Sequence, residues 1–140
     1  MKKDRIFLDA NILFSVAYGS KGLEHLWELQ EKGDCILLAS QYVVEEAKRN
    51  LTNPKQLAKL KSRLSTLQIV LEADPSLTLP INLPEKDKPV LMAAITAKAD
   101  YLLTGDVKHF GDYFGQTIMG VKISLPRDYL LPKLKLHPPR

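Results

Sequence analysis

The chain has 140 residues, which is the size of one domain built around one hydrophobic core. Hydrophobic residues make up 45% and charged residues 26%, and no apolar run approaches the roughly 20 residues that cross a bilayer, which excludes a membrane-spanning protein. The apolar stretch near the N-terminus is too short for a secretory signal. The single cysteine, Cys35, excludes an intramolecular disulfide and a cysteine-based zinc site. We therefore expect a protein of the reducing cytoplasm.

The formal net charge is only +4, but the cations are unevenly distributed. Six of them lie between positions 47 and 67, where there is no acid: Lys48, Arg49, Lys55, Lys59, Lys61 and Arg63. The last twenty residues hold five cations and a single acid. Two basic zones indicate an anionic partner, most commonly a nucleic acid. A solvated helix face and a loose basic tail would explain them equally well.

Apolar runs alternate along the chain with segments of helical spacing. In chain order we predict a strand at 6–8, helices at 11–17 and 23–32, a strand at 35–39, helices at 41–51 and 54–67, a strand at 68–71, a helix at 89–97, and strands at 101–103 and 118–123. Ser40 is a good N-cap, and Asn53 before Pro54 is typical of a helix start. The alternation predicts a mostly parallel sheet of about five strands with helices on both faces.

Residues 1–130 are predicted to form this single domain, and residues 131–140 a basic, proline-rich C-terminal tail. The longest irregular stretch runs from 74 to 86, and loops of this length are often functional or flexible.

Four acids fall where the carboxyl edge of such a sheet is expected, which is where open parallel sheets place their active sites. Asp9 and Asp106 directly follow the first and fourth strands, and Asp87 precedes the helix that leads into the fourth. Glu46 lies about two turns into the helix after the second strand. Helical geometry weakly favours Glu46 over Glu45 as the acid at this edge, because the Glu45 side chain points more directly away from the buried side of the helix.

Each acid alone is explained well enough as a helix cap, a turn residue or a surface charge. Four at one edge are harder to explain, because two unit charges 4 Å apart repel by roughly 4 kcal/mol at an effective dielectric constant near 20. A bound Mg²⁺ or Mn²⁺ would neutralise them, since both ions prefer oxygen ligands. Such an ion can activate water toward a phosphodiester. Together with the basic zones, this pattern predicts a nuclease.

The segments that contain these four acids resemble those of a known family. They are 7–13 (FLDANIL), Ser40 with Glu46, Asp87 with 89–95 (PVLMAAI), and 99–106 (ADYLLTGD). In this order and spacing they resemble the PIN-domain nucleases, many of which are VapC-like toxins of type II toxin–antitoxin pairs. The resemblance implies a three-layer α/β/α sandwich and metal-dependent cleavage of RNA. Carried over by position, Asp9, Glu46, Asp87 and Asp106 would be catalytic and hold Mg²⁺ or Mn²⁺. Asn11 and Thr104 would orient them. An antitoxin partner and a homodimer are also implied.

The chain departs from the family after its last aspartate, where many relatives carry another acid. Val107, Lys108 and His109 stand there instead. A histidine in a short helical turn is more often a half-buried surface residue than a general base, so His109 is not expected to be catalytic. The alternative function is a non-catalytic module that binds RNA or protein on the same scaffold.

Overall fold

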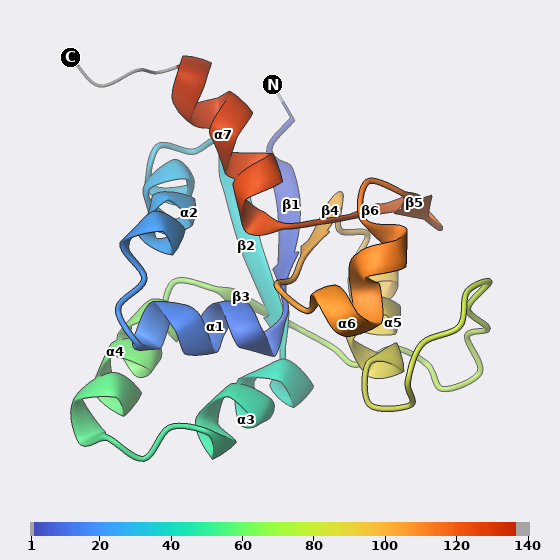
Figure 1. The fold of residues 1–140 in the computed structure, drawn as a ribbon, viewed down its shortest axis with the longest axis horizontal. Helices are drawn as coiled ribbons and strands as arrows, with labels where there is room; N and C mark the ends of the chain where they lie inside the picture. The colour runs from blue at the N-terminus through green and yellow to red at the C-terminus, as the bar shows by residue number, and fades with distance from the viewer. Residues whose placement is uncertain (1, 137–140) are drawn as a thin grey trace.

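The computed structural model describes residues 2–136 (Figure 1). Its strands are β1 (Asp4–Leu8), β2 (Cys35–Ser40), β3 (Gln68–Val70), β4 (Tyr101–Leu103), β5 (Thr117–Ile118) and β6 (Val121–Ser124). Its helices are α1 (Ala10–Ala17), α2 (Lys21–Glu31), α3 (Gln41–Arg49), α4 (Pro54–Leu64), α5 (Lys88–Thr96), α6 (Val107–Phe110), the 3₁₀ helix η1 (Gly111–Tyr113) and α7 (Pro126–Leu136). The predicted elements are all present, with ends that differ by up to three residues apart from the last strand.

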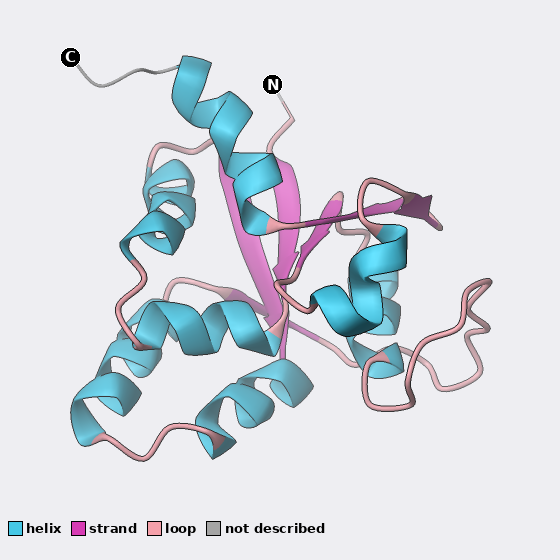
Figure 2. Ribbon diagram, viewed as in Figure 1, coloured by secondary structure: helices cyan, strands magenta, loops and turns pink. Residues whose placement is uncertain are grey.

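The strands form one six-stranded sheet in the order β3-β2-β1-β4-β6-β5. Every neighbouring pair is parallel except β5 and β6. Helices α1, α2 and α4 cover one face of the sheet, whereas α5 and α6 lie on the other (Figure 2). The predicted three-layer α/β/α sandwich with a mostly parallel sheet is confirmed.

The central strand β1 explains why this sheet needs helices on both faces. Ile6, Phe7 and Leu8 are all fully buried, although successive side chains of a strand point to opposite faces. A run of apolar residues with no polar alternation is typical of a parallel strand that is buried on both sides. The short apolar run near the N-terminus therefore forms the centre of the core.

The strand predicted at 118–123 is wrong, because this segment is a hairpin of β5 and β6. Met119 and Gly120 both have positive φ, 48° and 90°, which is the backbone conformation of a tight hairpin turn. Ile118 pairs with Val121 across this turn, in antiparallel register. The sheet has six strands instead of about five because the turn residues interrupt an otherwise apolar run.

The C-terminal segment differs from the predicted tail, since α7 continues through residue 136 with Pro132 inside it. The Tyr129 hydroxyl donates a hydrogen bond of 2.7 Å to Asp4 Oδ2, and Lys133 Nζ lies 3.4 Å from the same oxygen. These contacts hold α7 beside the start of β1. Residues 137–140 of the predicted tail lie outside the described residues. Within residues 2–136, no helix has both the length and the apolar character needed to cross a membrane.

Candidate functional site

The strand order places a crevice between the carboxyl ends of β1 and β4. After β1 the chain crosses over to β2, whereas after β4 it turns the other way toward β6. At such a reversal the following segments separate, and open α/β sheets bind their ligands there. A pocket of about 440 Å³ lies at this point. It is lined by Asp9, Ala10, Asn11, Phe14, Glu46, Ala47, Asn50, Lys86, Asp87 and Asp106. All four predicted acids therefore line one pocket.

Asp9 is the most constrained of these acids and is only 5% exposed. It is the N-cap of α1, and its Oδ1 accepts a hydrogen bond of 2.7 Å from the Ala10 amide. Its Oδ2 accepts hydrogen bonds from Thr104 Oγ1 at 2.8 Å and from Asn11 Nδ2 at 3.1 Å. Both carboxylate oxygens are thus held in one orientation by donors from two neighbouring strand ends.

Thr104 and Asn11 join the ends of β1 and β4 into one polar network. Thr104 Oγ1 is fully buried and accepts hydrogen bonds from Asn11 Nδ2 at 3.2 Å and from the Asp106 amide at 3.1 Å. Asn11 Oδ1 accepts a further bond of 2.8 Å from the Gly105 amide. A Cβ on Gly105 would lie 3.4 Å from the same Oδ1, so a larger residue would crowd this bond. The network fixes Asp106 relative to Asp9.

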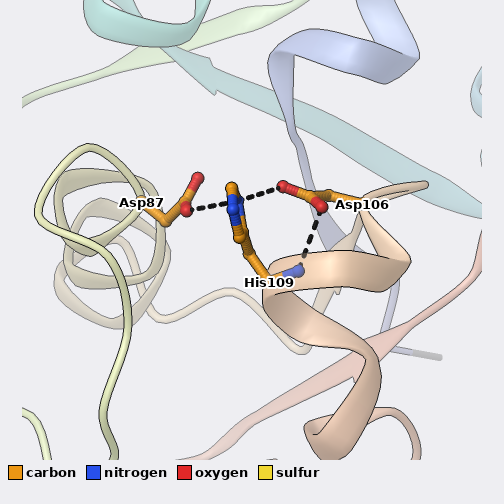
Figure 3. Close-up of side chains that lie close together, drawn as sticks. All are labelled: Asp87, Asp106 and His109. Atoms are coloured by element: carbon orange, nitrogen blue, oxygen red, sulfur yellow. Dashed lines mark hydrogen bonds and ion pairs between the residues drawn. The ribbon is translucent and has the colours of Figure 1, made fainter.

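Asp87, Asp106 and His109 form a second cluster, in which the imidazole lies between the two carboxylates (Figure 3). His109 Nδ1 lies 2.9 Å from Asp87 Oδ2 and 2.8 Å from Asp106 Oδ2. The backbone explains this placement, because Asp106 caps α6 by accepting a hydrogen bond of 3.1 Å from the His109 amide. Residues three apart on a helix share one face. The cap therefore brings the His109 ring back over the Asp106 side chain.

The environment of the pocket disfavours negative charge. Burial raises the pKa of Asp9 from 3.8 to about 6, and the charges of Asp87 and Glu46 add to this effect against the opposing hydrogen bonds. Burial also raises the pKa of Asp87, and the Asp106 and Glu46 charges contribute in the same direction, while His109 and Lys86 oppose them. Without a bound cation, ionisation of these carboxylates therefore costs free energy.

Glu46 and Glu45 occupy different surroundings on α3. Glu46 is half-buried and lines the pocket. Glu45 is exposed, accepts a hydrogen bond from Gln41, and lies 3.8 Å from Lys48 Nζ. The structure thus brings Glu46 to the other acids and leaves Glu45 outside the pocket.

The donor set of the pocket suits a divalent cation. Carboxylate oxygens are the ligands that Mg²⁺ and Mn²⁺ prefer, and four carboxylate side chains line this space. Asp87 Oδ2 is buried and receives no directed hydrogen bond within residues 2–136, so it has an acceptor site to offer. One ligand atom each from Asp87, Asp106 and His109 lies within 4.8 Å of the others. The residues fit the cation that the sequence led us to expect.

The sequence reasoning missed two residues at the site, His109 and Lys86. His109 lies in the acid cluster, where the sequence favoured a surface role. The signal was its position three residues after Asp106, which predicts a shared helix face. Lys86 is exposed at the rim of the pocket, next to Asp87. Its backbone carbonyl accepts a hydrogen bond of 2.7 Å from the Tyr42 hydroxyl, which ties this loop to α3.

The basic zone of residues 47–67 is partly neutralised in the fold. Glu24 of α2 receives two hydrogen bonds from the Arg63 guanidinium, at 2.6 and 3.1 Å, and lies 3.7 Å from Lys59 Nζ. Lys55 and Lys61, by contrast, form no ion pair with any residue in the range 2–136 and are exposed. The cations available to an anionic partner are therefore fewer than the sequence suggests.

Comparison with known proteins identifies the family to which the chain belongs. None of the curated proteins matches the sequence significantly. Among solved structures, a chain in the crystal structure of VapBC2 from Rickettsia felis bound to a DNA fragment from their promoter has a TM-score of 0.62 and 18% identity, over 86% of this chain and 98% of that chain. At this identity the likeness shows a shared fold. The family model described as the PIN domain matches residues 5–108, the part of the chain that contains β1 to β4 and all four pocket acids, and the chain therefore belongs to the PIN-domain family.

Proposed function

We propose that the chain is a metal-dependent endoribonuclease that cleaves RNA phosphodiester bonds in the pocket between β1 and β4. The observation that carries this proposal is the meeting of four carboxylates in one pocket, although they are far apart in sequence. The raised pKa values of Asp9 and Asp87 support this proposal, because a bound cation would relieve the cost of ionising these carboxylates. A binding module without chemistry has no use for such repulsion.

The pocket residues divide into two groups by their proposed role, which is to hold the cation or to contact the RNA. Asp9, Glu46, Asp87 and Asp106 would hold Mg²⁺ or Mn²⁺, with Asp9 oriented by the hydrogen bonds from Asn11 and Thr104. When bound, such a cation neutralises charge on a phosphodiester and lowers the pKa of a water molecule that attacks it. Lys86, exposed at the pocket rim, supplies a positive charge near the position where an RNA phosphate would lie.

The test is cleavage of a single-stranded RNA by the purified protein with Mg²⁺ or Mn²⁺. The expected result is cleavage that EDTA stops and that Asp9→Asn reduces at least 100-fold. The matched control is Asp112→Asn, which neutralises an exposed aspartate outside the pocket and should cleave like the unaltered protein. RNA binding with no cleavage in either metal would instead favour the alternative, a non-catalytic module.

We further propose that the chain acts in the cytoplasm as the toxin of a type II toxin–antitoxin pair. The fold shared with a chain of the VapBC2 structure supports this role. A second support is an apolar pocket between α2 and α7, about 690 Å³ in volume, whose lining includes Leu23, Val107 and Leu131. Val107 and Leu131 are 63% and 51% exposed, which is typical of a surface that a partner protein covers.

Co-expression with the product of the neighbouring gene tests the antitoxin, and light scattering of the chain alone tests the homodimer. Copurification that Leu131→Asp abolishes would support a partner at the α2–α7 pocket. Copurification that survives this substitution would place the partner elsewhere.

A further inference from the structure

The position of His109 in the acid cluster is not explained by hydrogen bonding. A neutral imidazole Nδ1 carries either one proton or one lone pair, directed in the ring plane, so it serves one partner. Here two carboxylate oxygens lie at 2.8 and 2.9 Å from that single nitrogen. Nδ1 and Asp87 Oδ2 are both buried, and neither has a directed hydrogen bond within the described part of the chain. Asp87 itself is only 7% exposed, so bulk solvent has little access to its carboxylate.

His109 Nδ1 lies from each of the two carboxylate oxygens at the spacing of neighbouring ligands around one cation. With octahedral bonds of about 2.1 Å, adjacent ligand atoms lie about 3.0 Å apart. The two separations from His109 Nδ1, 2.8 and 2.9 Å, are close to this value. A tetrahedral zinc site with similar bond lengths would need a wider spacing of about 3.3 Å. The cluster thus matches part of an octahedral coordination sphere.

The local backbone holds this arrangement without help from the ring. Asp106 Oδ1 accepts a hydrogen bond from the His109 amide, which leaves Oδ2 directed toward the imidazole. Asp87 is at the N-cap position of α5 but makes no side-chain cap bond, so its carboxylate is not committed to the helix end. Each of the three groups therefore has a free ligand atom directed at the others (Figure 3).

We propose that His109 Nδ1 is a metal ligand, together with Asp87 and Asp106. This inference rests on the proposed function only in that both place a cation in the same pocket. Imidazole nitrogen binds Mn²⁺ and later transition metals in preference to Mg²⁺, which is held almost entirely by oxygen. The chain therefore selects Mn²⁺ over Mg²⁺ more strongly than an all-carboxylate site would.

The test is pulsed electron paramagnetic resonance of Mn²⁺ bound to the full chain, which detects nitrogen bonded directly to the ion. We expect nitrogen coupling in the unaltered protein, a change in that coupling when the histidines carry ¹⁵N, and its loss in His109→Asn. The chain has three histidines, and His25→Asn, at a half-buried position of α2 outside the acid pocket, is the matched control that should keep the coupling. The isotope measurement needs no variant and holds even where a substitution unfolds the protein.

Metal affinities, measured by calorimetry, give a second readout. His109→Asn should weaken Mn²⁺ binding at least tenfold, and His109→Asp should shift the ratio of Mn²⁺ to Mg²⁺ affinity at least tenfold toward Mg²⁺. Absence of nitrogen coupling in the unaltered protein, its persistence in His109→Asn, or an unchanged affinity ratio in His109→Asp would each overturn the inference. Cleavage of RNA is measured separately: nitrogen coupling without cleavage refutes the proposed function alone, and cleavage without coupling refutes this inference alone.

Discussion

Neutralising Asp9 should change how the stability of the metal-free protein depends on pH. The pKa of Asp9 is about 6 in the folded chain, against 3.8 for an exposed aspartate. Because the folded value is the higher one, the protonated carboxyl stabilises the fold fully below about pH 4. This stabilisation is lost as the pH rises through about 6. Asp9→Asn removes the titration, so the variant should lack this loss.

The shift predicts the size of the effect. A difference of about two pKa units corresponds to about 3 kcal/mol between the two protonation states. For a chain of this length, this is a change in Tm of about 10 °C. The Asp87 charge is one of the causes that raise the pKa of Asp9, so this repulsion is also removed in the variant and acts in the same direction.

Thermal unfolding in EDTA between pH 4.5 and 8 measures the effect. The quantity compared is the fall in Tm over this range, which cancels groups that titrate alike in both proteins. The unaltered chain should lose about 7 °C more than Asp9→Asn, because pH 4.5 already lies above the ordinary pKa of 3.8 and only about two thirds of the ~3 kcal/mol is lost within this range. The Asp112→Asn variant should follow the unaltered chain, since this aspartate lies outside the pocket. If the curves of the unaltered chain and Asp9→Asn run parallel, the electrostatic account of the pocket is refuted.

Three further outcomes are expected. Thr104→Val should lower the free energy of unfolding by about 2 kcal/mol in urea, because it removes one hydrogen bond each from Asp9, Asn11 and the Asp106 amide, whereas Thr104→Ser should be nearly neutral. A double-mutant cycle between Glu24 and Arg63 should give a coupling of about 1 kcal/mol, since the pair is bidentate and partly buried; a value near zero would show that it contributes only to solubility. RNA binding should weaken with salt, and Lys61→Ala should lower the slope of log affinity against log salt by about one, unless α4 lies away from the RNA.

Much of the fold followed from local pattern. The apolar run of β1 and the N-cap at Ser40 are signals that act within a few residues, and the structure places a buried strand and a capped helix there. The segment 118–123 misled the prediction because it is mostly apolar, while the turn depends on the backbone conformation at Met119 and Gly120. The helical course of residues 131–136 was missed because Pro132 usually argues against a helix interior.

The amino-acid sequence by itself determined the order of strands and helices through β4, the edge at which the acids gather, and the family, because periodicity, caps and short motifs depend on near neighbours. Only the tertiary structure decided which side chains touch. Whether the His109 ring lies in solvent or between Asp87 and Asp106 depends on how α6 packs beside the start of α5, two elements joined through β4. The spacing along α6 accounts for the contact of His109 with Asp106, but the contact with Asp87 follows from packing between separate elements, which no spacing along one segment encodes.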